Sequence, residues 1–263
     1  MKKTAVVTGA SSGIGKSTAQ ALSKMGYTVY GLNRRGCEPG EITYIRTDVT
    51  DECSVNSAVS QILEKEGKID LLINNAGFGI SGAVEFTDVG DAERLFDVNF
   101  FGMVRVCRAV IPSMRKAGGG RIINISSVAA IAPIPFQTFY SASKSAVKTY
   151  SLALANEVRD FGITVCAVMP GDISTGFTDA REKSAEGDAV YGERISRSVK
   201  KMENDERNGM KSSVAGEKIA RIAASKSRKP LRTLGFSYKA IAFLIKLLPT
   251  SAVNGLIALL YAK

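Results

Sequence analysis

The sequence predicts a single α/β domain in which helices cover both faces of a doubly wound parallel sheet of about seven strands. Short β-branched apolar runs alternate along the chain with longer segments in which apolar residues recur at helical spacing. The short runs are mainly apolar and do not alternate strictly with polar residues, as in strands that are buried on both faces. A length of 263 residues suits one large domain.

The ends of the expected strands determine where the motifs lie in the fold. They span Ala5–Thr8, Thr28–Leu32, Ile42–Arg46, Ile69–Ile73, Arg121–Ile125 and Thr164–Val168, with Leu231–Leu234 as a candidate last strand. Helical spacing is shown by Ala19, Leu22 and Met25, and again from Val55 to Leu63, from Val104 to Met114 and from Val147 to Val158. This order of elements is typical of repeated strand–helix–strand units.

Composition excludes several kinds of chemistry. The chain has no histidine, so the commonest metal ligand and the commonest general base are both missing. Acid–base chemistry must therefore use Tyr, Lys, Asp, Glu or Cys. The cysteines, at Cys37, Cys53, Cys107 and Cys166, form no CxxC pair, so we expect free thiols in a reducing compartment and no metal site.

Charge and hydropathy bear on partners and location. The formal net charge is +10, with the excess mainly after Arg181, but no nucleic-acid-binding motif accompanies it, so no nucleic acid is expected as a partner. The apolar run near the N-terminus is too short for a signal-peptide core, and no stretch reaches the ~18–20 apolar residues of a membrane span. We therefore expect a cytoplasmic protein.

Two segments near the end of the chain differ from the repeating pattern. Within a catalytic domain over 1–235, residues 176–213 are rich in charged residues and serine, with one amphipathic helix indicated by Ile195, Val199 and Met202. This insertion is either a solvated surface segment or a mobile lid. We favour the lid, because the insertion follows a strand end, where α/β proteins bind ligands.

Residues 236–263 form an expected helical extension. An apolar face runs through Phe236, Ala240, Phe243, Leu244, Leu247 and Leu248, with Lys239 and Lys246 on another face; Pro249 breaks the pattern, and Val253, Leu256, Ile257 and Leu260 resume it. Two interpretations remain open. The helices pack on the body or on a partner subunit, or they form a basic, hydrophobic patch that touches a membrane surface or lines an apolar substrate entrance.

A glycine-rich turn follows the first strand and opens the first helix. It contains Gly9, Ser11, Ser12, Gly13, Ile14 and Gly15. Glycines let the backbone turn tightly and approach a pyrophosphate, and a helix N-terminus offers free N–H groups to an anion. In this context the turn predicts a dinucleotide site of Rossmann type.

The end of the second strand indicates which dinucleotide binds there. A carboxylate at this place would bond the ribose 2′-hydroxyl, but the sequence has Arg34 and Arg35 instead. Guanidinium groups suit a phosphate dianion, so NADP(H) is favoured over NAD(H). The alternative is that both arginines are simply solvated.

Together with six later motifs, the spacing Thr-Gly-x-x-x-Gly-Ile-Gly resembles the short-chain dehydrogenase/reductase family over residues 4 to about 175. The later motifs are Asp48-Val49, Asn74-Asn75-Ala76-Gly77, Asn99, Ser126-Ser127, the YxxxK set of Tyr140 and Lys144, and Pro170-Gly171-Asp172-Ile173-Ser174-Thr175. The resemblance implies an oxidoreductase that works as a homo-oligomer, a dimer or a tetramer. The long apolar tail departs from simple members and looks like the tails of members that act on steroids, retinoids or other lipid-like carbonyls.

The resemblance also implies roles for individual residues. Asp48 and Val49 would contact the adenine, and Asn75, Ala76 and Gly77 would line the cofactor groove. Pro170 and Gly171 would meet the nicotinamide end, while Ile173 and Thr175 would contact its carboxamide. Ser127 rather than Ser126 would face the substrate, Lys144 would bond the nicotinamide ribose, and Asn99 would hold a water that links Lys144 to solvent.

The residues themselves support this chemistry. Tyr140 and Lys144 stand one helical turn apart and so share a face. A phenol is a poor base at neutral pH, and a nearby ammonium is expected to lower its pKa towards a useful range. Ser127, at the carboxyl end of a strand, can donate a hydrogen bond to a substrate oxygen. The alternative, a tyrosine at the edge of the core beside a solvated lysine, does not explain the other motifs.

The sequence therefore predicts an NADP(H)-dependent oxidoreductase that interconverts a carbonyl and an alcohol, with a bulky apolar substrate. Two other functions are alternatives. A 3-oxoacyl-thioester reductase would use the basic surface to attract an acidic carrier. A non-catalytic NADP(H)-sensing or scaffold protein would not need the complete set of Asn99, Ser127, Tyr140 and Lys144.

Overall fold

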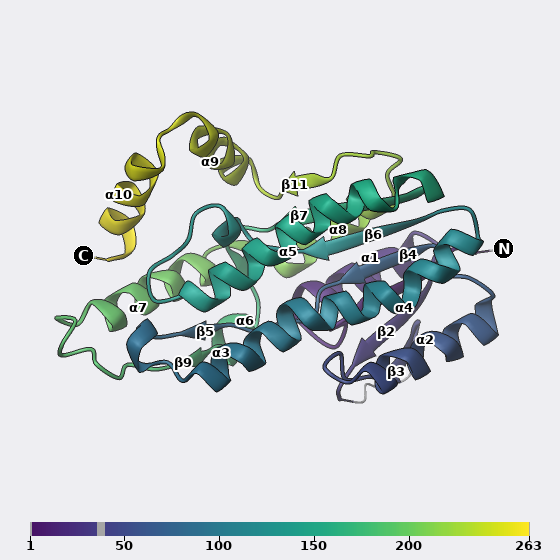
Figure 1. Cartoon of the computed structure of the whole chain (residues 1–263), viewed down its shortest axis with the longest axis horizontal. Coiled ribbons are helices and arrows are strands. Elements are labelled where there is room, and N and C mark those ends of the chain that lie inside the picture. The colour runs from purple at the N-terminus through teal and green to yellow at the C-terminus, as the bar shows by residue number, and fades with distance from the viewer. Residues whose placement is uncertain (1, 36–39, 263) are drawn as a thin grey trace.

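Seven parallel strands form the centre of the molecule in the computed structural model, which describes residues 2–35 and 40–262. Their order across the sheet is β11-β7-β6-β4-β1-β2-β3 (Figure 1). The strands are β1 (Thr4–Thr8), β2 (Thr28–Asn33), β3 (Ile42–Arg46), β4 (Leu71–Asn74), β6 (Gly120–Ile125), β7 (Ile163–Met169) and β11 (Leu231–Thr233). The sequence-based expectation of a doubly wound parallel sheet is confirmed, and Cys37 lies outside the described residues.

Helices cover both faces of this sheet. The helices are α1 (Gly13–Lys24), α2 (Glu52–Glu66), α3 (Val89–Phe96), α4 (Gly102–Lys116), α5 (Thr138–Glu157), α6 (Phe177–Ala180), α7 (Arg194–Arg207), α8 (Ser212–Ala224), α9 (Phe236–Leu247) and α10 (Thr250–Tyr261). One apolar cluster packs α2, α4 and α5 against the sheet, and a second packs α1 and α8 on the other face. The apolar periodicity of the sequence is thus used to bury two cores, one on each side.

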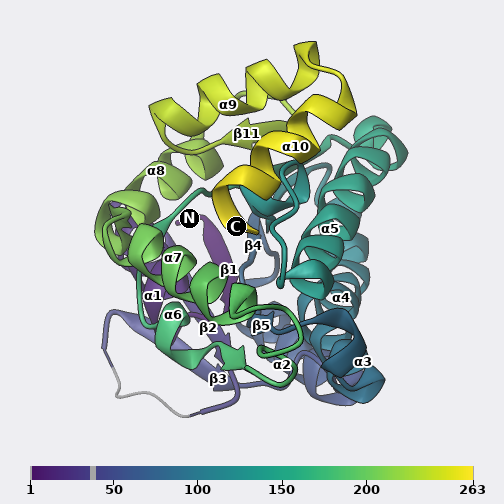
Figure 2. The ribbon, with the colours of Figure 1, turned by 90° about the vertical axis from the view of Figure 1, so that its left-hand side faces the viewer.

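The order of strands fixes where a ligand can bind. β1 pairs with β2 on one side and with β4 on the other, so the chain turns in opposite directions from this point. In such sheets the crevice at the carboxyl ends of the central strands is the usual binding place. Figure 2 looks onto this end of the sheet, with α9 and α10 above it.

Residues 176–213 lie beside this crevice and are attached to the body by short strand pairs. β9 (Glu182–Lys183) pairs with β5 (Ile80–Ser81), and β10 (Met210–Lys211) pairs with β8 (Ile173–Ser174). The helix expected in this segment is α7, on which Ile195 and Met202 are buried. The segment is therefore a structured covering of the sheet's carboxyl end.

Candidate functional site

One cavity of about 840 Å³ runs along the carboxyl ends of the strands, from the first helix to the tail helices. It collects residues from motifs that lie far apart in the sequence. All of the predicted site residues line it except Gly15 and Asn99, which lie behind its wall. The motifs identified in the sequence thus converge on a single place.

The glycine-rich turn forms one end of the cavity. Gly9 (φ +65°) and Gly13 (φ +53°) have left-handed backbone conformations that favour glycine. Helix α1 begins at Gly13 without an acidic residue in its first turn, and no side chain of the described residues caps it. Its first N–H groups are therefore available to an anion beside the cavity, and the turn fits the pyrophosphate of a dinucleotide.

Gly15 stands where the backbone of the turn passes closest to α1. A Cβ there would lie 2.9 Å from the Gly9 carbonyl carbon, and nearer still to the Gly9 oxygen and the Asn75 amide nitrogen. The Asn75 side chain donates to the carbonyls of Thr8 (3.1 Å) and Gly9 (3.2 Å), while the Thr8 hydroxyl accepts from the N–H groups of Asn75 and Ala76. Residues 74–77, which we call the NNAG segment, therefore fix the shape of the glycine turn.

Arginines and one carboxylate mark the next part of the cavity. Arg34 and Arg35 are exposed and line the cavity just after β2. The Asp48 carboxylate accepts from the Thr50 N–H (2.9 Å) and hydroxyl (2.7 Å). Burial alone would raise the pKa of Asp48, but these bonds and the charges of Arg34 and Arg105 outweigh it and lower that pKa. This region therefore offers guanidinium groups to a ligand and keeps Asp48 ionised.

Tyr140 and Lys144 project from one face of α5, as the sequence predicts. The Lys144 ammonium lies 5.7 Å from the centroid of the Tyr140 ring and donates to the Ile125 carbonyl (3.1 Å). The Ser126 hydroxyl donates to the Lys144 carbonyl (2.8 Å), so it is committed to holding α5 against β6. Ser127 lines the cavity, its hydroxyl accepts from the Ala129 N–H (3.1 Å), and its proximity to Tyr140 lowers the pKa of that phenol, which fits the expectation that Ser127 faces the substrate.

The pKa values at this site differ from one expectation. Loss of hydration raises the pKa of Tyr140 to about 12, against opposing effects of the Ser127 hydrogen bond and the Arg181 charge. Burial lowers the pKa of Lys144 to about 8. The expected lowering of the Tyr140 pKa by Lys144 is therefore wrong for this structure, because loss of hydration dominates. At neutral pH Tyr140 is a phenol that holds its proton.

Asn99 lies in a π-helical turn (Asp97–Phe101) between α3 and α4. Its side-chain oxygen accepts from the Phe78 N–H (2.9 Å), and its nitrogen donates to the Phe78 carbonyl (3.0 Å) and the Ser143 hydroxyl (3.2 Å). A Cβ on Gly77 would lie 2.8 Å from the Asn99 oxygen and 3.5 Å from the Lys144 nitrogen. Asn99 thus supports the wall behind Gly77 and Lys144, and its expected water stays a prediction.

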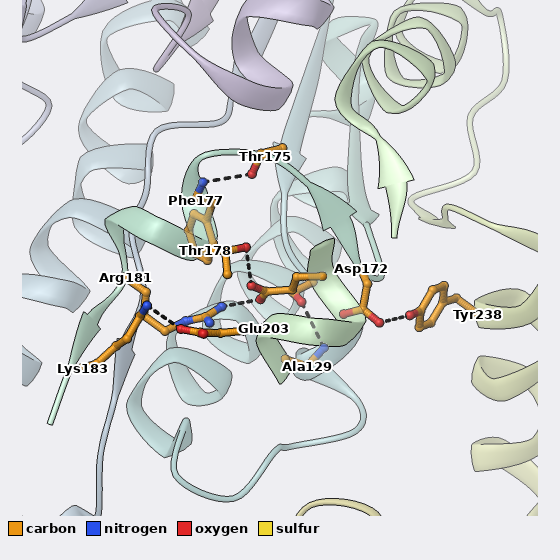
Figure 3. A network of polar contacts seen from close by, with 11 residues as sticks. Ala129, Asp172, Thr175, Phe177, Thr178, Arg181, Lys183, Glu203 and Tyr238 are labelled. Atoms are coloured by element: carbon orange, nitrogen blue, oxygen red, sulfur yellow. Dashed lines mark hydrogen bonds and ion pairs between the residues drawn. The ribbon is translucent and has the colours of Figure 1, made fainter. Parts of the chain in front are cut away.

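A buried ion pair near Tyr140 was missed by the sequence analysis. Arg181 pairs with Glu206, and their side chains are only 1% and 16% exposed. The Thr178 hydroxyl donates to the same carboxylate (2.7 Å), as Figure 3 shows. The Phe177 ring lies 5.8 Å from the Tyr140 ring. In the sequence Thr178, Arg181 and Glu206 belong to the charged segment 176–213, and no pattern there indicates that an arginine is buried.

The tail is attached to the wall of the cavity at Asp172, which was also missed. The Tyr238 hydroxyl of α9 donates to the Asp172 carboxylate, as Figure 3 shows, and its ring occupies the place where a side chain on Gly171 would stand. The Tyr261 hydroxyl of α10 donates to Asp205 of α7 (3.1 Å). Burial and the nearby Asp205 raise the pKa of Asp172, while the bond from Tyr238 opposes the rise.

The tail helices also supply the apolar part of the cavity wall. Leu244 and Leu248 of α9 line the cavity together with Val253 and Ile257 of α10, which are buried. This arrangement agrees with the interpretation of the tail as the lining of an apolar entrance. Phe236 of the same expected apolar face instead points into solvent, 89% exposed. Within the described part of the chain, no helix is long and apolar enough to cross a bilayer.

Comparisons with known proteins agree with this geometry. The family model for short chain dehydrogenases matches residues 3–186. A 3-ketodihydrosphingosine reductase from Bacteroides thetaiotaomicron is 48% identical over 231 residues, which are 87% of this chain and 86% of that protein. The crystal structure of a short-chain dehydrogenase from Streptomyces avermitilis is 31% identical and superposes with a TM-score of 0.83 over 94% of this chain and 93% of that one.

A third relative carries a nucleotide. The 3-ketoacyl-(acyl-carrier-protein) reductase from Brucella melitensis, solved in complex with NADH, is 25% identical, with a TM-score of 0.75 over 88% of this chain and 96% of that one. The sheet, the glycine turn and the Tyr140–Lys144 pair thus occur in a chain whose relatives are oxidoreductases. The protein belongs to the short-chain dehydrogenase/reductase family, whose members use NAD(P)(H) to interconvert carbonyl and alcohol groups.

Proposed function

We propose that this protein is an NADP(H)-dependent reductase of a long-chain lipid ketone. The observation that carries the proposal is the single cavity, which begins at the glycine turn and the two arginines, passes Tyr140, and ends between apolar residues of α9 and α10. Such a cavity suits a nucleotide at one end and a bulky apolar molecule at the other. The first part of the proposal concerns the cofactor, the second the substrate.

The cofactor assignment rests on charge. Arg34 and Arg35 stand where a carboxylate would select the 2′-hydroxyl of NAD(H), and guanidinium groups instead suit the 2′-phosphate of NADP(H). Asp48 is held by Thr50 and remains ionised, in a position to contact the adenine beside Val49. The remaining proposed contacts are Gly9, Ser11, Ser12, Gly13, Ile14, Gly15, Asn75, Ala76, Gly77, Pro170, Gly171, Ile173 and Thr175.

The proton chemistry rests on Tyr140. When bound, the cofactor supplies the hydride. Because its pKa is raised to about 12, the Tyr140 phenol holds a proton that it can donate to the substrate oxygen during reduction. Ser127, which lines the cavity beside that phenol, would donate a second hydrogen bond to the same oxygen. Lys144 would hold the nicotinamide ribose and return a proton to Tyr140. Asn99 would hold a water that links Lys144 to solvent.

The substrate assignment rests on the tail and on one relative. The cavity, of about 840 Å³, has an apolar end that suits a hydrocarbon chain, and the Bacteroides relative is named for reduction of 3-ketodihydrosphingosine, a long-chain lipid ketone. A steroid- or retinoid-like ketone would suit the same walls. A 3-oxoacyl-thioester reductase is the second candidate, favoured by the Brucella relative and by the net charge of +10, which would attract an acidic carrier.

The proposal includes the protein's organisation. Residues 1–235 would form the catalytic domain, residues 176–213 a lid that moves over the cavity, and residues 236–263 an extension that selects the substrate. We further propose a homo-oligomer, a dimer or a tetramer, since members of the family are often oligomeric. The buried thiols of Cys107 and Cys166 suit the reducing cytoplasm, where we place the protein.

The cofactor proposal is tested by titrating the protein with NADPH and NADH and following fluorescence. Replacing Arg34 and Arg35 together by alanine should weaken NADPH binding by roughly tenfold per arginine, since a hydrogen bond to a charged group contributes ~1.5–3 kcal/mol. NADH binding should hardly change, and the exposed Arg159→Ala variant serves as the control. Equal affinity of the unmodified protein for NADH and NADPH would contradict the proposal.

Turnover assays test the proposed substrate and the proposed role of Tyr140. NADPH oxidation should be fastest with 3-ketodihydrosphingosine in mixed micelles, slower with a steroid ketone, and slowest with acetoacetyl thioester. The Tyr140→Phe variant should bind NADPH normally but lose about 10²–10⁴-fold in rate, the usual contribution of a positioned acid. Undiminished turnover by that variant would refute the role of Tyr140, and a preference for the thioester would favour the second candidate.

A further inference from the structure

Helix α9 presents an apolar surface to solvent. Phe236, Phe243 and Leu247 are 89%, 63% and 65% exposed. Spacings of seven and four residues place them on one face of the helix, which we call the outer face of α9. Large side chains at such exposure are expected in a surface that meets an apolar partner.

The other side of α9 is apolar as well, but it serves the cavity. Ile241, Ile245 and Leu248 line the cavity, and their spacing puts them roughly opposite the outer face. No α9 residue falls in the fully buried class, although every one of them is described. A helix that is apolar on both sides and packed on only one of them has an unsatisfied face.

The cavity opens at this same surface. Leu244 of α9, with Leu256 and Leu260 of α10, lines the cavity and is also about half exposed, at 52%, 54% and 49%. Residues that belong to both the wall and the surface mark a mouth. In Figure 1 the two helices diverge from their connecting turn, α9 towards β11 and α10 towards α7. The mouth therefore lies between them.

The charge of the tail indicates what the outer face meets. Lys239 and Lys246 are exposed and adjoin the outer face on one side. After Glu217 the sequence has no Asp or Glu, while nine lysines and arginines follow. An apolar helix face flanked by lysines, with no acidic neighbour in its own segment, complements the boundary between the anionic headgroups and the acyl chains of a bilayer.

We propose that α9 and α10 seat the protein on the surface of an anionic lipid bilayer, with the mouth of the cavity inside the contact. A lipid substrate then passes from the bilayer to Tyr140 without crossing water. The contact is peripheral, because the outer face is one side of a twelve-residue helix. The identity of the cargo rests on the proposed function, but the docking itself does not.

Vesicle flotation with the full-length protein tests the docking. Binding should be strong on vesicles of phosphatidylcholine with phosphatidylglycerol and weak on phosphatidylcholine alone. The double variant Lys239→Ala/Lys246→Ala should lose roughly thirtyfold in partitioning, since each lysine at an anionic surface contributes roughly fivefold. Its control is Lys24→Ala/Lys116→Ala, which removes two exposed lysines elsewhere and should bind normally.

The triple variant Phe236→Ser/Phe243→Ser/Leu247→Ser should not bind vesicles at all. Its matched control replaces exposed valines distant from the tail, Val84→Ser/Val89→Ser/Val190→Ser, which are 51%, 69% and 78% exposed in the structure. None of the six side chains lines the cavity, so both variants should keep full turnover of a small water-soluble ketone in the absence of lipid. Only the tail variant should lose turnover of a ketone lipid presented in vesicles.

The outcomes separate the two proposals. Vesicle binding by a protein that reduces no ketone would refute the proposed function and leave the docking standing. Equal binding to neutral and anionic vesicles, or binding that survives the triple tail variant, would overturn the docking. A third result would also overturn the docking: the unmodified protein is a dimer in sedimentation and does not bind vesicles, and the triple tail variant is a monomer. The outer face would then be covered by a second copy of the chain.

Discussion

Replacing Gly15 by alanine tests whether the close approach at the glycine turn is essential. Alanine is the better helix former, so at an open position in α1 the change would stabilise the protein by up to ~1 kcal/mol. At Gly15, however, the new Cβ would lie 2.9 Å from the Gly9 carbonyl carbon and closer to its oxygen. The atom in the way belongs to the backbone, which cannot rotate aside as a side chain would.

The magnitude follows from these opposing effects. Forcing an extra methyl group into a packed place typically costs ~1–3 kcal/mol. Because the clash is with backbone, the upper part of this range, ~2–3 kcal/mol, applies. After the gain of up to ~1 kcal/mol in helix propensity, the free energy of unfolding should fall by about 1–2 kcal/mol, which for a chain of this size lowers Tm by about 3–6 °C. Because the Asn75 amide is held against the same carbonyl, the NNAG segment must shift too, and NADPH should bind several-fold more weakly.

Gly255→Ala is the matched control, since Gly255 also lies inside a helix but has no atom within 4 Å of its added Cβ among the residues described. That variant should leave NADPH binding unchanged and strengthen α10 by ~0.5–1 kcal/mol, seen as slower hydrogen exchange there. Scanning calorimetry and a fluorescence titration provide the remaining measurements. A Gly15→Ala protein with unchanged Tm and unchanged NADPH affinity would refute the steric argument.

Three further predictions concern buried charges and the tail. Burial lowers the pKa of Lys144 from 10.5 in the unfolded chain to about 8 in the folded one. Its burial therefore lowers the free energy of unfolding by a constant amount below about pH 8, and this cost disappears as the pH rises from about 8 to 10.5. Lys144→Met should therefore abolish turnover yet raise Tm at pH 7, with the gain shrinking towards pH 10; a lower Tm at pH 7 would contradict this. Arg181→Met leaves Glu206 unpaired and should lower the free energy of unfolding by ~3–5 kcal/mol in urea titrations, whereas a loss under ~1 kcal/mol would mean that the pair is not buried. Tyr238→Phe removes the bond to Asp172 and should raise the KM for NADPH roughly twofold to tenfold with little change in kcat, and an unchanged KM would show that this bond does not hold the loop.

The fold could be predicted well because its signals are local. Each strand of the sheet contains a short, mainly apolar run, and the expected bounds differ from the observed ones by no more than two residues. The largest difference is at β4, expected from Ile69 but beginning at Leu71. There Asp70 uses its side chain to accept from the Thr4 N–H (2.8 Å), which belongs to the start of β1.

The site could be predicted where its residues follow strand ends. Tyr140, Lys144, Ser127 and the glycine turn all reach one cavity, because parallel strands bring their carboxyl ends together. The contacts that escaped prediction join residues without a local pattern. Asp172 and Tyr238 are 66 positions apart, and nothing in either neighbourhood of the sequence indicates the other.

The pKa values of Tyr140 and Lys144 depend on how deeply the folded chain buries them, not on their spacing in the sequence. The sequence places an ammonium one turn from the Tyr140 phenol, but it does not say how much water reaches the pair. The structure removes most of that water, and this raises the pKa of the phenol while lowering that of Lys144. The burial of Arg181 escaped prediction for the same reason, since only the folded chain shows what covers it.

The attachment of the tail has an evolutionary consequence. Tyr238 and Tyr261 attach the two last helices to Asp172, which follows β7, and to Asp205 on α7. A lineage that kept these two carboxylates could exchange its last thirty or so residues and inherit a new range of substrates with the catalytic apparatus intact. The same pair of positions marks where grafts between related enzymes should be joined.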